Sequence, residues 1–377
     1  MTGRERILAA IRGERPDRIP VTTGYFYEWV DDWKTAEPSY RRLIEYSRRH
    51  ADVFQPWSPR AVNEKLFMTS SPKVTVEWRR WEEGGEKYLE ALVRAPGGDL
   101  RQVSKTIPGL ATTWTVEHFL KTDRDVEAFL SIPYEPVCYD CSGWRAELDR
   151  IGTRGVLMPG LADPMCRAAE LFEFGDFTVW AATEPETFRR ILDFFARGAG
   201  DYLTAVLASG VEGVFRIVGA EYATPPYLKP ERFRAYVLEY DTPLIERIHR
   251  AGQLARVHCH GRVRDVLPMM VEMGADVTDP VEPPPSGDVT LEEAFAITGD
   301  RLAMCGNIEI REIETMSETE LDARIRDACE TGKRRGRFLL APSAEPITVP
   351  LSEELERRYL AYIDAGLRWS GCSEGCR

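Results

Sequence analysis

The sequence lacks the features of a protein that binds nucleic acid or spans a membrane. Its 49 Lys and Arg residues are outnumbered by 61 Asp and Glu residues, which gives a net charge of -12. Nucleic acids and anionic membranes attract basic surfaces, so neither is expected as a partner. No apolar run approaches the roughly 20 residues that cross a bilayer. Residues 1–12 also lack the apolar core and cleavage site of a signal peptide, which predicts a cytoplasmic protein.

Paired cysteines are scarce as well. Most of the eight cysteines lie singly within apolar segments, as reduced and buried thiols do. The exceptions are Cys138 with Cys141, and Cys372 with Cys376. A structural zinc site usually needs two such pairs close together, so a tail site is the alternative to free thiols. We expect one domain over residues 1–368 and a mobile tail over 369–377.

The sequence has no internal repeat, and no glycine-rich phosphate loop follows any expected strand, which disfavours a doubly wound sheet, the structural alternative. Short apolar segments alternate with amphipathic helices, a pattern typical of parallel strands buried on both faces. Eight such units predict an α/β protein with a (β/α)8 TIM barrel. Residues 73–106 alternate around glycine turns and predict an inserted antiparallel hairpin or meander. The expected barrel strands are 19–21, 53–54, 155–159, 214–218, 254–258, 275–279, 302–305 and 338–341.

Histidine is rare, yet two of the five histidines lie two residues apart where the strand 254–258 ends. The spacing of His258 and His260 puts both side chains on one face of a strand, and neutral imidazole is a common zinc ligand. The pair predicts a metal site at the mouth of the barrel. The alternative is one structural histidine and one polar loop residue. Cys259 would point into the helix layer and is interpreted as packing.

Carboxylates follow several other strands, and the active sites of barrels lie at the carboxyl ends of the strands. Glu221, Glu282 and Glu345 follow the fourth, sixth and eighth expected strands. A catalytic zinc takes three protein ligands and keeps one open position, so any of these glutamates would complete the site. We place Glu282 with the two histidines as a metal ligand and regard all three glutamates as candidates for proton transfer. Taken singly, each glutamate is better explained as a solvated surface acid, and it is their coincidence with the two histidines that points to a site.

Substrate contacts are expected at the same mouth. Asn307 follows the seventh strand, and Arg262 lies just beyond the histidines, where a guanidinium can hold an anionic group. Three aromatic residues after the first strand would line an apolar pocket for a planar substrate, or belong to the core. They are Tyr25, Tyr27 and Trp29.

Several motifs occur in an order that resembles the uroporphyrinogen decarboxylase superfamily, over nearly the whole chain. They are RERILAAIRG at 4–13, PDRIPV at 16–21, GAE at 219–221, PERF at 230–233, HCHG at 258–261, GAD at 274–276, GNI at 306–308 and APS at 341–343. The resemblance implies a TIM barrel and one of two chemistries. Uroporphyrinogen decarboxylase itself needs no metal and binds substrate carboxylates through an arginine-rich segment. Residues 22–29 contain no arginine, and Glu28, Asp31 and Asp32 would repel such a substrate, so this activity is not expected.

The other branch of the superfamily comprises zinc-dependent methyltransferases that work with corrinoid proteins. These enzymes bind zinc through a His-x-Cys motif after the fifth strand and a further Cys after the eighth. His258 matches the first ligand, whereas His260 and Ala344 stand at the two cysteine positions. The resemblance therefore implies a zinc site with nitrogen and oxygen ligands, which is a harder and stronger Lewis acid than a thiolate site.

The expected function is a metal-dependent methyltransferase that moves a methyl group from a methoxylated or methylated small molecule to a corrinoid protein or a thiol. One alternative is a metal-free lyase related to tetrapyrrole chemistry, with His258 or His260 as general acid. Another is a non-catalytic binder of a corrinoid or tetrapyrrole. The inserted hairpin is a candidate surface for a homodimer.

Overall fold

The computed structural model describes residues 1–23 and 33–371. Two predictions lie outside the described residues, namely the aromatic pocket after the first strand and the paired cysteines of the tail. They concern Tyr25, Tyr27, Trp29, Cys372 and Cys376. Within the described ranges, no helix is long and apolar enough to cross a membrane.

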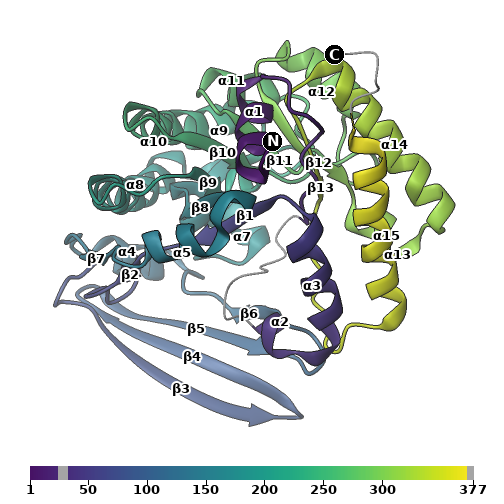
Figure 1. Ribbon diagram of the computed structural model, residues 1–377. Helices are drawn as coiled ribbons and strands as arrows, with labels where there is room; N and C mark the ends of the chain where they lie inside the picture. The colour runs from purple at the N-terminus through teal and green to yellow at the C-terminus, as the bar shows by residue number, and fades with distance from the viewer. Residues whose placement is uncertain (24–32, 372–377) are drawn as a thin grey trace.

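A curled sheet of seven parallel strands forms the centre of the molecule (Figure 1). Long runs of buried residues form these strands, because helices cover the outer face and the strands' own side chains fill the inner one. The order in the sheet follows the order in the chain. The strands are β1 (Val53–Trp57), β8 (Gly155–Ala162), β9 (Val214–Val218), β10 (Leu254–His258), β11 (Val277–Asp279), β12 (Ala303–Ile308) and β13 (Phe338–Pro342).

The first expected strand is reduced to a single parallel bridge between Val21 and Leu340 of β13. The N–H of Thr22 donates to the Leu340 carbonyl at 2.9 Å, and on the other side the N–H of Asp52 donates to the Val21 carbonyl at 2.7 Å. This segment therefore links the two edge strands of the curled sheet, as in a TIM-barrel-like fold. Pro20 has no N–H to donate, which limits the ladder that the segment can form.

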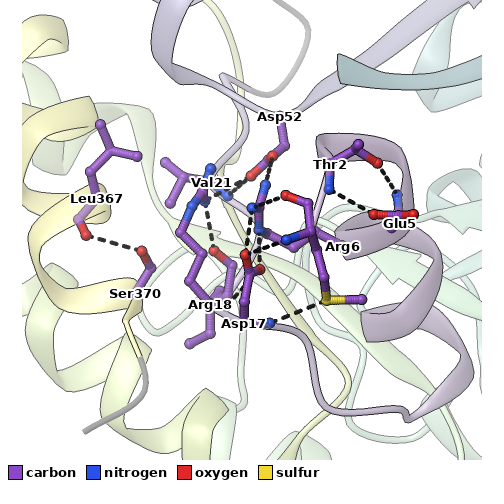
Figure 2. Close-up of polar contacts among 11 residues, drawn as sticks. Thr2, Glu5, Arg6, Asp17, Arg18, Val21, Asp52, Leu367 and Ser370 are labelled. Carbon is purple, nitrogen blue, oxygen red and sulfur yellow. Dashed lines mark hydrogen bonds and ion pairs between the residues drawn. The ribbon is translucent and has the colours of Figure 1, made fainter. Parts of the chain in front are cut away.

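An ion-pair network fixes this closing segment (Figure 2). Asp52 accepts Arg6 Nη1 at 2.6 Å and the N–H of Val21 at 2.9 Å, and it lies 2.8 Å from Arg18 Nη1. Arg6 Nε donates to Asp17 at 2.7 Å. Because Arg6 belongs to helix α1 (Gly3–Arg12), the network ties that helix, the closing segment and the start of β1 together.

Helix α1 covers the amino-terminal ends of the strands. Arg4 Nε donates to the carbonyl of Gly155, the first residue of β8, and Arg337 before β13 donates to the carbonyl of Ile11. An apolar cluster fills the inside of the sheet beneath this helix. Its buried members are Ile7, Ala10, Ile11, Phe54, Val156, Met158, Val214, Val277, Ala303, Cys305, Leu339 and Ala341. The opposite, carboxyl ends of the strands are left for polar side chains.

The remaining helices include those that cover the outer face of the sheet, with α8 and α10 on one side of Figure 1 and α14 and α15 on the other. They are α2 (Trp33–Ala36), α3 (Arg41–His50), α4 (Asp123–Leu130), α5 (Trp144–Ile151), α6 (Pro164–Ala169), α7 (Phe174–Thr183), α8 (Pro185–Ala208), α9 (Pro230–Phe233), α10 (Glu239–Arg250), α11 (Leu267–Glu272), α12 (Leu291–Thr298), α13 (Ile310–Thr315), α14 (Glu318–Arg335) and α15 (Glu353–Ser370).

A separate antiparallel sheet lies below the curled sheet in Figure 1. It has four strands, β3 (Thr75–Glu83), β4 (Glu86–Ala95), β5 (Gly98–Thr106) and β6 (Thr113–Glu117). The first three lie in the range 73–106, where the sequence predicted a hairpin or meander, and the fourth lies beyond it. The connection between β5 and β6 pairs with the segment after β13, where Leu110 bridges Thr348. A short ladder joins β2 (Arg60–Ala61) and β7 (Tyr139–Asp140).

Candidate functional site at the strand mouth

The two histidines lie against each other at the end of β10. Their ring centroids are 4.6 Å apart and the rings are nearly perpendicular. His258 shares the inner face of β10 with Arg256, because side chains alternate along a strand. Cys259 is buried in the outer apolar layer with Val257, as expected for a packing residue. The strand therefore presents its imidazoles to the mouth and its thiol to the helices.

A carboxylate from the neighbouring segment holds each imidazole. His258 Nδ1 lies 2.9 Å from Asp279 Oδ2 at the end of β11, and His260 Nδ1 lies 3.1 Å from Glu282 Oε1. The second oxygen of Glu282 accepts the N–H of Gly261 at 2.9 Å. Carboxylates placed in this way fix the orientation of the ring and leave Nε2 as the nitrogen that can bind a metal or a substrate.

Arg256 completes a buried chain of charges behind His258. Its Nε lies 2.6 Å from Asp279 Oδ1, and both side chains are 2% exposed. Burial alone would raise the pKa of Asp279, but Arg256 and His258 hold it well below its usual range. Burial lowers the pKa of His258 to about 4. The imidazole of His258 is therefore neutral at physiological pH, as a metal ligand must be.

The pKa of His260, which pairs with Glu282, shifts in the opposite direction to that of His258. Burial would lower the pKa of His260, but its hydrogen bond to Glu282 and the charge of that carboxylate raise it overall. In return, His260 holds the pKa of Glu282 below its usual range despite burial. The His260 imidazole is 38% exposed, whereas that of His258 is 8% exposed. One histidine is thus enclosed by the barrel and the other faces its opening.

Glu221 lies in the turn Ala220–Ala223 that follows β9. Its Oε2 is buried and has no hydrogen-bond donor among residues 1–23 and 33–371. Burial raises the pKa of this carboxyl group, although the charges of His260 and Arg216 act in the opposite direction. The turn therefore brings a carboxyl group with a raised pKa into the electrostatic field of His260.

The other predicted residues have structural contacts of their own. Glu345 Oε2 lies 2.7 Å from the ammonium group of Lys34, whose side chain is 1% exposed. Asn307 donates from Nδ2 to the Val281 carbonyl at 2.7 Å and accepts Arg324 Nη2 at 2.7 Å. Arg262 is exposed beside the mouth. The contacts of Asn307 hold the end of β12, and the contact of Glu345 holds the segment after β13. The substrate contacts of Asn307 and Arg262 stay predictions.

The predicted metal set is brought together only in part. His258, His260 and Glu282 are neighbours, but both carboxylate oxygens of Glu282 already have a partner. One contacts the His260 imidazole and the other accepts the N–H of Gly261. Within the described part of the chain, no group of three or more His, Cys, Asp or Glu side chains is arranged to hold a metal ion. The donor types nevertheless suit zinc, because two carboxylate-oriented imidazoles face a mouth that also contains the orphaned Glu221 oxygen. Metal binding stays a prediction.

Neither Arg256 nor the contact between Asp279 and His258 was predicted from the sequence. A signal was available, because Arg256 is a charged residue inside an apolar strand and shares its face with His258. Such a residue needs a buried partner of opposite charge. In the described segment, neither Cys138 nor Cys141 forms a disulfide.

Comparison with known proteins places this arrangement in a family. The family model for uroporphyrinogen decarboxylase (URO-D) matches residues 147–354, more than half of the chain. The chain belongs to the uroporphyrinogen decarboxylase family. The match begins just before β8 and includes every strand end that contributes to the site, and it confirms the resemblance inferred from the sequence.

One relative and one solved structure of similar fold are methyltransferases by name. "Methylcobamide:CoM methyltransferase MtaA" of Methanosarcina barkeri is 23% identical over 160 residues, which are 42% of this chain and 44% of that protein. The chain thus matches less than half the length of that relative. The solved structure of a methyltransferase from Methanosarcina mazei covers 97% of this chain and 98% of its own, with 16% identity and a TM-score of 0.61. That structural match shows that the two chains share a fold.

Proposed function

We propose that this family member is a zinc-dependent methyltransferase that moves a methyl group from a methoxylated or methylated small molecule to a corrinoid protein or a thiol. The observation that carries the proposal is the pair of imidazoles at the strand mouth, 4.6 Å apart, with each Nδ1 held by its own carboxylate. The Methanosarcina barkeri relative, whose name gives a methylcobamide and CoM as its reactants, supports this transfer chemistry.

His258 and His260 would hold the metal through Nε2. Asp279 and Glu282 would keep each ring in the required tautomer, because a carboxylate on Nδ1 retains the proton at that nitrogen. The buried contact between Arg256 and Asp279 keeps Asp279 ionised at neutral pH. Asp279 can therefore hold the His258 ring in this orientation. Glu282 as third ligand remains a prediction, and its contacts support an orienting role.

Bound zinc would supply a Lewis acid that activates an oxygen or a thiol at neutral pH. Glu221 would accept or donate the proton that is transferred when this oxygen or thiol is activated. Its buried Oε2 has no donor in the described part of the chain, and its raised pKa favours a carboxyl group that can both give and take a proton. Glu345 is less suited to this role because Lys34 neutralises it.

The test is methyl transfer by zinc-loaded protein in both directions, followed by the visible spectrum of cobalamin. One reaction contains methylcobalamin and a panel of small thiols, and the other contains reduced cobalamin and O-methylated phenols. We expect turnover in at least one direction and its loss in the His258→Ala/His260→Ala double variant. The control is His249→Ala, which removes the imidazole of a surface pair with Asp276 at 2.8 Å. Absence of turnover in both directions by zinc-containing protein would contradict the proposal.

A metal-free lyase is the second candidate, and the raised pKa of Glu221 favours it. A carboxyl group whose pKa is raised by burial can act as a general acid without help from a metal. The two candidates respond differently to chelation, because removal of metal would abolish methyl transfer and leave a lyase unchanged.

A further inference from the structure

Two buried carboxyl groups face each other behind the turn that carries Glu221. Asp163 follows β8 and caps α6, where its Oδ1 accepts the N–H of Cys166 at 2.6 Å. Asp241 belongs to α10. Both side chains are 0% exposed, and the two carboxyl groups lie within hydrogen-bonding reach of each other.

Most oxygens of this pair lack a donor. Oδ2 of Asp163 and both oxygens of Asp241 are buried without a hydrogen-bond partner in the described ranges. Burial raises the pKa of Asp241 to about 8. Burial and the charges of Asp241 and Glu221 raise the pKa of Asp163, whereas the Cys166 N–H acts in the opposite direction. Two carboxylates that are both desolvated and adjacent cannot both stay ionised, because desolvation and repulsion oppose the second charge.

We propose that Asp163 and Asp241 share a single proton and that the resulting hydrogen bond holds the turn that places Glu221 at the mouth. The hydroxyl of one carboxyl group donates to a carboxylate oxygen of the other, which supplies the donor that these oxygens otherwise lack. Asp241 is then a positioning residue that acts through Asp163.

Asp163 contacts the backbone that leads into the turn Ala220–Ala223. The N–H of Asp163 donates to the Val218 carbonyl at 2.8 Å, and a Cβ at Gly219 would come within 2.1 Å of Asp163 Oδ1. The carboxyl group therefore lies against the backbone two residues before Glu221. The N–H of Tyr222 closes the turn on the Gly219 carbonyl at 3.1 Å. The role of Glu221 rests on the proposed function, whereas the shared proton does not.

The shared proton is tested by infrared spectroscopy of the full chain labelled with side-chain ¹³C-aspartate. We expect the isotope-shifted band of a protonated carboxylic acid at pH 7, and its loss in Asp241→Asn, where the amide donates to an ionised Asp163. Asp193→Asn, at an exposed carboxylate that accepts the hydroxyl of Tyr240, is the matched control and should keep the band. Glu221→Gln should also keep it, since glutamate is unlabelled. Absence of the band in the wild type, or its survival in Asp241→Asn, would overturn the shared proton.

The positioning role is tested by amide hydrogen exchange over residues 219–224. The side-chain amide introduced by Asp241→Asn can still donate to Asp163, so this variant should exchange at the wild-type rate. Asp241→Leu has no donor and should exchange at least tenfold faster in this segment. Segments on the far side of the barrel, such as β13, report whether the variants are folded. Equal exchange in all three proteins would overturn the positioning role, and neither experiment depends on methyl transfer.

Discussion

His258 and Asp279 are register partners in neighbouring parallel strands, and the imidazole Nδ1 lies 2.9 Å from the carboxylate Oδ2. The contact is buried, since the His258 side chain is 8% exposed and that of Asp279 is 2% exposed. The same carboxylate also binds Arg256, so one aspartate balances a buried cation and orients a candidate ligand. Buried residues of the barrel interior, Arg256 and Asp279, therefore position His258 at the mouth.

Replacement of Asp279 by Asn tests this arrangement. It leaves Arg256 buried without its counter-charge, and breaking a buried pair in this way costs about 3–5 kcal/mol. Loss of an orienting carboxylate also typically weakens metal binding about 10- to 100-fold. Urea unfolding and zinc titration would measure the two effects. His249→Ala, which removes the exposed partner of the surface pair with Asp276, is the control, and its cost should stay near or below about 1 kcal/mol. Equal costs for the two variants would contradict the account.

The buried carboxyl pair predicts a pH dependence of stability. The pKa of Asp241 rises to about 8 in the fold, from an ordinary value of 3.8. The native state therefore binds more protons than the unfolded chain between these values, and stability falls as pH rises through that window. Asn at this position needs no proton, so the stability of Asp241→Asn relative to the wild type should increase by on the order of 5 kcal/mol between pH 4 and pH 8. Urea unfolding at several pH values would show this divergence, and parallel curves would refute it.

Gly219 provides a test of the turn that carries Glu221. Its φ is +133°, and an added Cβ would meet Asp163 Oδ1 at 2.1 Å and the Cys166 Cβ at 2.4 Å. Gly219→Ala should therefore destabilise the protein by several kcal/mol, because backbone strain and a buried clash combine. Gly210→Ala is the matched control, since Gly210 has a φ of +70° and open space around it. That variant should cost only about 1 kcal/mol, and thermal unfolding would compare the two.

The sequence predicted the parallel strands well because they are buried on both faces and read as apolar runs, as in β10 and β13. It overstated the first strand, where Pro20 leaves only a bridge at Val21. The fourth antiparallel strand was missed because its side chains, including Trp114 and Val116, are mostly exposed and bury no recognisable face.

In the site, too, the sequence predicts local features but does not predict contacts between distant segments. The spacing of His258 and His260 along one strand is a local signal, and the two rings do lie together. The carboxyl pair of Asp163 and Asp241 joins a strand end to a helix far along the chain, and nothing in the order of residues marks such a contact. Long-range polar contacts of this kind depend on packing geometry that a single sequence does not reveal.

The central claim, a metal site built on the two histidines, is tested most directly by the zinc content of purified protein after dialysis against zinc. The wild type, the His258→Ala/His260→Ala double variant and the His249→Ala control would be compared by elemental analysis. The account predicts about one zinc per chain in the wild type and the control, and its loss in the double variant. Zinc-free wild-type protein, or a double variant that retains its zinc, would contradict it.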